Sequence, residues 1–190
     1  TKYIHAGYQP GNGDPRQLPI VQSTTYTYDS SDDIAAVFDE PTHALIYSRF
    51  ANPTVMAVEQ KVADLEGGAA AMATSSGQAA TMISIMNLCS AGDSFVTSSE
   101  IYGGTLNLFS VTLKKFGIEA IYVDQDAPED EIKAAFKDNT KLLFGETISN
   151  PSMAVLDLEK FANIAHDMGV PFVVDSTFAT PVLCKPIEYG

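Results

Sequence analysis

The sequence predicts an α/β protein in which a mainly parallel sheet lies between two layers of helices. From residue 52 onward, segments with helical spacing alternate with short apolar runs, which are typical of strands buried on both faces. The chain has 190 residues, of which 45% are apolar, so it can bury one sizeable core and carry a smaller appendage. We therefore expect a three-layer α/β/α domain with right-handed crossovers.

The first 50 residues lack this alternation. Gly and Pro recur there, and helical spacing appears only near residues 32–39. Residues 23–28 have high β propensity, but no partner strand lies nearby in the sequence. We therefore expect residues 1–50 to form an extended N-terminal arm that packs on something other than itself, and residues 51–190 to form the α/β domain.

The expected elements of the domain follow from apolar spacing and its interruptions. Residues 53–65 are predicted to be helical because apolar side chains recur at helical spacing, Asn52 can cap the helix start and Gly67 can end the helix. By the same reasoning the other helices are expected at residues 78–88, 106–116, 129–136 and 158–168. The strands are expected at residues 69–74, 94–98, 118–123, 141–146 and 171–175.

The net charge and the cysteine spacing argue against several classes of binding partner and site. The net charge of −13 argues against a nucleic-acid or anionic-membrane partner, because phosphate groups are bound by clustered Lys and Arg. No apolar run reaches transmembrane length, and the first residues do not resemble a signal peptide. Cys89 and Cys184 are far apart and lack zinc-ligand spacing, so we expect no metal site. A reduced cytoplasmic setting fits best, although two cysteines can also pair in a secreted protein.

Ligands of parallel α/β sheets bind at the carboxyl ends of the strands. This rule selects four segments that directly follow expected strands, and we take them as the candidate site. They are residues 75–78 (Ser-Ser-Gly-Gln), 101–104 (Ile-Tyr-Gly-Gly), 149–151 (Ser-Asn-Pro) and 175–177 (Asp-Ser-Thr).

Each segment has both a chemical and a purely structural interpretation. The turn at residues 75–78 opens a helix whose free N–H groups could bind a phosphate, or it is simply a helix cap. Tyr102 could stack on a flat ring or be structural. Asp175, at the end of a buried strand, could pair with a protonated ring nitrogen or brace a loop. Arg49 could bind an oxyanion or lie on the surface.

Nucleotide chemistry is disfavoured, because the sequence contains neither a Gly-x-Gly-x-x-Gly fingerprint nor P-loop spacing. An anion site, a stacking ring and a buried carboxylate together indicate a phosphorylated aromatic cofactor.

Four motifs carry a resemblance to a known family. They are Tyr-Ser-Arg-Phe-Ala-Asn-Pro-Thr at 47–54, Ser-Ser-Gly-Gln at 75–78, Ile-Tyr-Gly-Gly-Thr at 101–105 and Val-Asp-Ser-Thr-Phe-Ala-Thr at 174–180. In this order they resemble the motifs of the Cys/Met-metabolism enzymes that depend on pyridoxal 5′-phosphate (PLP). The resemblance covers nearly the whole chain. It implies the large domain of a PLP-dependent transferase of fold type I, which is aspartate aminotransferase-like.

The resemblance also implies roles for individual residues. Gly77 and Gln78 would give backbone amides to the PLP phosphate. Tyr102 would stack on the pyridine ring and take part in proton transfer, Asp175 would pair with the ring nitrogen, and Thr177 would also contact the cofactor. Asp175 and Tyr102 are thus the expected catalytic residues.

Three further residues receive roles in the same way. Asn150 would lie near the cofactor O3′ and the substrate carboxylate. Tyr47 and Arg49 would reach the phosphate of a neighbouring subunit, so that the site is shared across a dimer. The resemblance implies a dimer-based homotetramer that acts on a small amino-acid substrate.

Within the family the sequence looks most like the O-acetylhomoserine sulfhydrylase branch, because Gln78 stands where the lyases more often carry Met. That branch replaces acetate by sulfide or a thiol at the γ-carbon. Methionine γ-lyase and the cystathionine γ-synthases and lyases are the alternatives.

The family's Schiff-base lysine lies in a Ser-x-Thr-Lys-like motif beyond Asp175, and a C-terminal domain follows it. No such motif occurs up to Gly190, and Lys185 does not match it. We therefore expect the lysine beyond residue 190, an active full-length parent and an inactive 190-residue chain. Two other classes stay open, namely a non-catalytic fragment that keeps subunit contacts and anion binding, and a nucleotide-dependent enzyme.

Overall fold

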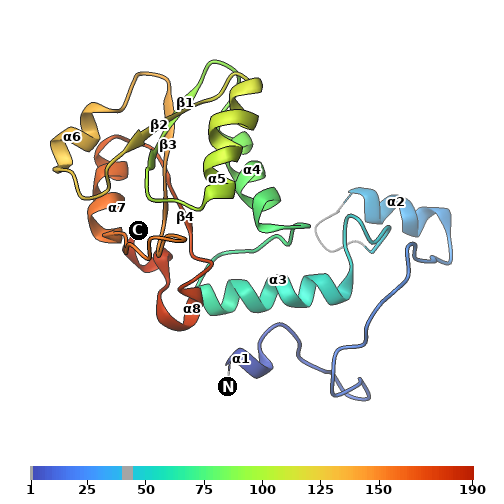
Figure 1. Cartoon of the computed structure of the whole chain (residues 1–190). Helices are drawn as coiled ribbons and strands as arrows, with labels where there is room; N and C mark the ends of the chain where they lie inside the picture. Colours follow the sequence, from blue (N-terminus) through green and yellow to red (C-terminus); the bar gives the residue numbers. More distant parts are fainter. Residues whose placement is uncertain (1, 40–44) are drawn as a thin grey trace. The chain divides into compact units, whose positions relative to one another are not determined.

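The computed structural model describes residues 2–39 and 45–190, which form two compact units that divide between Ala73 and Thr74 (Figure 1). The first unit contains the helices α1 (Lys2–His5), α2 (Ser31–Asp39) and α3 (Pro53–Glu66).

Helix α3 begins and ends where the sequence predicts. The side chain of Asn52 accepts hydrogen bonds from the N–H groups of Thr54 and Val55, which satisfies two of the free donors at the helix start. Gly67 adopts the left-handed conformation with φ of 80°, and its N–H donates to the carbonyl of Ala63.

Outside α1 and α2, the described residues before α3 belong to no helix or sheet strand. Their β-prone stretch forms one isolated antiparallel bridge, between Thr25 and Tyr47, rather than a place in a sheet. Val21 is held at both backbone groups, because its N–H donates to Thr54 Oγ1 and its carbonyl accepts from Asn52 Nδ2, each over 3.0 Å. The expected division of the domain near residue 50 stays a prediction.

The second unit is built on a four-stranded sheet with the order β2-β1-β3-β4. All three pairs of neighbouring strands are parallel, which confirms the predicted parallel sheet. The strands are β1 (Ser94–Ser98), β2 (Glu119–Val123), β3 (Thr140–Glu146) and β4 (Phe172–Asp175).

Helices cover both faces of this sheet (Figure 1). Successive strand residues point to opposite faces, so Phe95 packs in one buried cluster with the helix at residues 77–88, while Val96 packs in another with the helix at residues 158–167. This arrangement gives the expected three layers. The helical elements are α4 (Gly77–Leu88), α5 (Gly103–Asn107), its π-helical continuation η2 (Leu108–Leu113), α6 (Glu129–Ala134), α7 (Leu158–Asp167), α8 (Thr180–Leu183) and the 3₁₀ helix η3 (Pro186–Tyr189).

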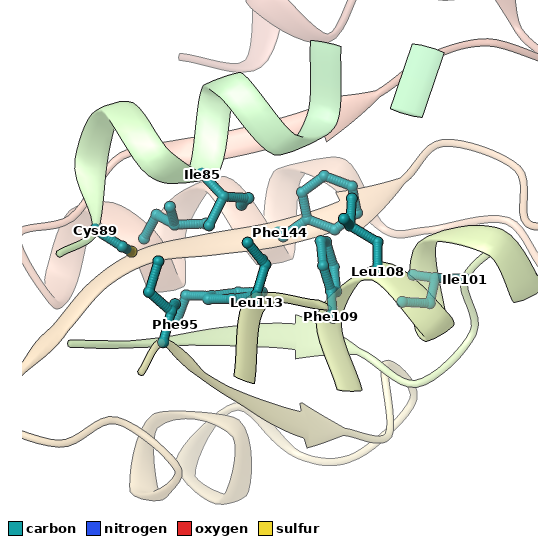
Figure 2. Close-up of a cluster of buried hydrophobic side chains, with 10 residues drawn as sticks. Ile85, Cys89, Phe95, Ile101, Leu108, Phe109, Leu113 and Phe144 are labelled. Carbon is teal, nitrogen blue, oxygen red and sulfur yellow. The ribbon is translucent and has the colours of Figure 1, made fainter. Parts of the chain in front are cut away.

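An aromatic cluster forms the centre of the core between the sheet and the α4 and η2 helices (Figure 2). The ring of Phe109 meets Phe95 edge-on at 4.8 Å and Phe144 edge-on at 5.1 Å, measured between ring centroids. Edge-to-face contacts of this kind add roughly 1 kcal/mol each to the free energy gained from burial. The sheet is therefore fixed firmly to one helical layer by side chains of η2.

One expected strand does not form, and one expected helix begins earlier than predicted. Residues 69–74 form no strand, although their apolar run predicted one. A strand needs a neighbouring strand to accept its hydrogen bonds, and here the N–H of Ala73 instead donates to Glu59 Oε1 over 2.8 Å. The helix expected at residues 106–116 begins earlier, at Gly103, because the N–H of Leu106 already donates to the carbonyl of Tyr102.

Candidate functional site

A cavity of about 370 Å³ lies at the carboxyl ends of the strands, and we call it the strand-end cavity. Six of the residues singled out in the sequence line it together, as the sheet topology predicts. Those six are Gly77, Gln78, Tyr102, Asn150, Asp175 and Thr177, and the rest of the lining is Ser76, Glu146, Ile148 and Phe178.

The start of α4 contributes a group of hydrogen-bond donors. Ser76 is the N-cap, and its Oγ accepts from the N–H of Ala79 over 3.1 Å. Among the described residues, the N–H groups of Gly77 and Gln78 have no acceptor. A Cβ atom at Gly77 would meet nothing within 4 Å, so this backbone borders open space. Free N–H groups at the positive end of a helix dipole suit an anion such as a phosphate.

Tyr102 follows β1 and stands at the entry to α5, with 47% of its surface exposed. Gly104 lies directly against the Tyr102 ring, and a Cβ atom at Gly104 would clash with the ring carbons. The second glycine of the segment therefore leaves room for the ring beside the helix. An aromatic face held in this way can stack on a flat ligand.

Asp175 is the last residue of β4 and is half-buried. Its Oδ1 accepts from the backbone N–H of Thr177 over 2.9 Å and from the Thr177 hydroxyl. In the part of the chain that the structure describes, no hydrogen bond or ion pair engages Oδ2. Thr177 thus fixes the carboxylate through one oxygen and leaves the other for a donor in the cavity.

Glu146 is a site residue that the sequence reasoning missed. It is the last residue of β3, lies in register with Asp175 on β4, and is 5% exposed. Its Oε1 accepts from the backbone N–H of Tyr102 over 2.9 Å, and its carboxyl also accepts from the backbone N–H of Asn150.

The surroundings of Glu146 raise its pKa to about 7, first through burial and further through the negative charge of Asp175, while the two backbone hydrogen bonds act in the opposite sense. An ionisable residue at the carboxyl end of a buried strand is the same signal that selected Asp175. That signal was present in the sequence at residue 146 as well.

Tyr47 and Arg49 belong to the first unit and do not line the strand-end cavity. The guanidinium of Arg49 lies over the Tyr47 ring, 4.9 Å from its centroid, and 5.3 Å from the centroid of the Phe50 ring. Their expected contact with the phosphate of a neighbouring subunit stays a prediction.

Within residues 2–39 and 45–190, no group of three His, Cys, Asp or Glu side chains is placed to hold a metal ion. None of the helices in the described ranges is long and apolar enough to cross a membrane.

Known proteins resemble the chain along its whole length. Residues 1–190 match the family described as Cys/Met metabolism PLP-dependent enzyme. The chain is 44% identical to an O-acetyl-L-homoserine sulfhydrylase of Corynebacterium glutamicum and 45% identical to a homocysteine/cysteine synthase of Saccharomyces cerevisiae. Both similarities cover 100% of this chain but 44% of the relative, so the chain spans less than half the length of these proteins.

A solved structure agrees with these relatives. The crystal structure of a putative O-acetylhomoserine (thiol)-lyase from Campylobacter jejuni matches with a TM-score of 0.92 and 39% identity. The match covers 100% of this chain and 46% of that one. That crystal structure contains N′-pyridoxyl-lysine-5′-monophosphate, which is PLP joined to a lysine.

Proposed function

The chain belongs to the Cys/Met metabolism PLP-dependent enzymes, and on this premise we propose that it is the cofactor-binding part of an O-acetylhomoserine sulfhydrylase. Its fold is that of PLP-dependent enzymes of fold type I. The observation that carries the proposal is the strand-end cavity, which combines free helix-start amides, an aromatic ring and a carboxylate with one open oxygen. Relatives at 44% and 45% identity support the choice of branch.

The cavity residues fit PLP group by group. The N–H groups of Gly77 and Gln78 would bind the phosphate, because they have no acceptor among the described residues and face open space. Tyr102 would stack on the ring. Oδ2 of Asp175 would accept from the protonated ring nitrogen, while Thr177 holds Oδ1 in place.

PLP supplies an electron sink for the negative charge that develops on the substrate carbons. Asp175 would keep the ring nitrogen protonated, which strengthens that sink. Asn150 would orient the substrate carboxylate, and Tyr102 would move a proton at the substrate. Acetate would leave from the γ-carbon of O-acetylhomoserine, and sulfide or a thiol would take its place.

The same proposal assigns residues 1–50 to an inter-subunit arm and residues 51–190 to the PLP-binding domain. Tyr47 and Arg49 would reach the cofactor phosphate of a neighbouring subunit, so each site would be shared across a dimer. The working form would be a dimer-based homotetramer in the cytoplasm. The lysine that anchors PLP would lie beyond residue 190. The 190-residue chain alone would then bind PLP only non-covalently and would not turn over.

The test uses the full-length protein and the 190-residue chain in parallel, each mixed with PLP and then treated with borohydride. The proposal expects the full-length protein to show a visible absorbance band with PLP, and borohydride to attach the PLP to the protein covalently. It also expects the full-length protein to form homocysteine from O-acetylhomoserine and sulfide. The 190-residue chain should show neither. A full-length protein that ignores PLP would overturn the proposal, and thiol release from methionine without γ-replacement would favour the lyase alternative.

Asp175→Asn provides the matched variant, because it keeps the shape of the side chain but removes the charge. We expect it to lower kcat by on the order of a hundredfold, the usual effect of removing one preorganised electrostatic partner. Asp126→Asn, at an exposed position outside the strand-end cavity, should leave kcat unchanged. Equal activity of the two variants would exclude Asp175 from the catalytic group.

A further inference from the structure

Glu146 lines the strand-end cavity and lies between two of the loops that form it. Its carboxyl accepts the backbone N–H of Tyr102, which lies in the segment after β1, and the backbone N–H of Asn150, which lies in the segment after β3. The two segments come from neighbouring strands of the sheet. One buried side chain therefore connects the two loops that bring an aromatic ring and a polar amide to the cavity.

Burying a carboxyl group at the end of a strand costs more free energy than burying an apolar side chain of the same size. Taking such a group out of water costs several kcal/mol when it is charged, and an apolar residue would fill the volume without that cost. The hydrogen bonds from Tyr102 and Asn150 offset part of this cost. Both hydrogen-bond partners of Glu146 line the strand-end cavity. This indicates that Glu146 serves the site rather than the packing of the core.

Asp175 adds a second reason. It lies beside Glu146 in the parallel register of β3 and β4, so two carboxyl groups stand at the same edge of the sheet. Burial and the charge of Asp175 raise the pKa of Glu146 to about 7. Near neutral pH, Glu146 can therefore carry a proton, which reduces the negative charge at this edge of the cavity.

We propose that Glu146 is a positioning residue for the PLP site, which holds Tyr102 and Asn150 in place through their backbone N–H groups. The proposal rests on the PLP-binding function proposed above. Glu146 acts through these two residues and does not itself contact the reacting atoms. Without its carboxyl oxygen, both loops lose a common anchor and the ring of Tyr102 loses its fixed place over the cofactor.

The test compares Glu146→Ala, Glu146→Gln and a control in the full-length protein, after PLP has been removed and added back. Gln125→Ala is the matched control, because Gln125 is also 5% exposed and bonds Ser98 Oγ over 3.1 Å, yet it does not line the strand-end cavity. The readouts are the PLP dissociation constant, the visible circular dichroism of bound PLP and the thermal midpoint of the cofactor-free protein.

We expect Glu146→Ala to raise the PLP dissociation constant about tenfold and to weaken the circular dichroism, as the loss of one to two buried hydrogen bonds would. Glu146→Gln keeps an oxygen for the Tyr102 N–H and should stay within about threefold of wild type. Gln125→Ala should lower the thermal midpoint while leaving the dissociation constant and the circular dichroism unchanged.

Three results would overturn the inference. If Glu146→Ala binds PLP like wild type, the inference fails while the proposed function stands. If Glu146→Ala and Gln125→Ala weaken PLP binding equally, the effect is general destabilisation rather than positioning. If wild type itself binds no PLP, the proposed function fails and the inference fails with it.

Discussion

Replacing Glu146 with Gln should make the cofactor-free protein progressively more stable than wild type as the pH rises from 4.5 to about 7. The folded protein holds a proton on Glu146 up to a pKa of about 7, whereas the unfolded chain releases it near 4.5. Over this interval the native state binds more protons than the unfolded state, so the free energy of unfolding of wild type falls as the pH rises. A Gln side chain does not titrate and escapes this loss.

The size of the effect follows from the two pKa values. A difference from 4.5 to about 7 corresponds to roughly 3 kcal/mol, at about 1.4 kcal/mol per pKa unit. The gap between Glu146→Gln and wild type should therefore widen by roughly 3 kcal/mol between pH 4.5 and 7 and stay constant at higher pH. The neighbouring charge is Asp175, and it is present in both proteins.

Urea unfolding of both proteins at a series of pH values from about 4.5 to about 8 measures this gap directly. Glu159→Gln, at an exposed position in the first turn of α7, is a control with the same change of charge. A gap that is the same at pH 5 and at pH 8 would refute the reasoning, because it would show that Glu146 titrates alike in the folded and unfolded chains.

Three further predictions concern the stability and reactivity of the fold. Burial, and after it the charge of Asp93, raises the pKa of the Cys89 thiol to about 11. A thiol reagent at about pH 8 should therefore label Cys89 only after unfolding, and rapid labelling of the native protein would contradict this. Gly145→Ala should lower the free energy of unfolding in urea by about 1–3 kcal/mol, because the new Cβ would lie 2.5 Å from Cδ2 of the buried Leu156. A variant as stable as wild type would show that the side chains around residue 145 can move to accept the methyl group. Asn52→Ala should lower the free energy of unfolding by about 1 kcal/mol through the lost cap of α3, and an unchanged thermal midpoint would speak against the cap.

The sheet could be predicted from the sequence because its strands carry a strong local signal. Residues 94–98 and 141–146 are short segments with consecutive apolar residues at their centres and helical segments on either side, and both coincide closely with the observed β1 and β3. Residues 69–74 carry a similar signal but form no strand, since strand formation depends on a hydrogen-bonding neighbour that the local sequence does not reveal. The early start of α5 at Gly103 was missed because glycine lowers helix propensity.

The location of the candidate site could also be predicted, because parallel strands bring their carboxyl ends together whatever the details of packing. The role of Glu146 could not, because it depends on hydrogen bonds from Tyr102 and Asn150, which lie 44 and 4 positions away in the sequence. Tyr47 and Arg49 are different again. Their expected partner belongs to another subunit, so the sequence supports their role only through the family motif.

The aromatic cluster of Phe95, Phe109 and Phe144 lies inside the layers, while the cavity residues Tyr102 and Asn150 come from segments that begin after the strands have ended. Evolution can therefore vary the loops in length and sequence on an inherited scaffold, and new substrate preferences need not weaken the interior. Glu146 is the exception to this freedom. A residue without a side-chain carbonyl oxygen at this position would leave the N–H groups of Tyr102 and Asn150 without their acceptor, so we expect divergence to keep Glu or Gln here while the loops around it change.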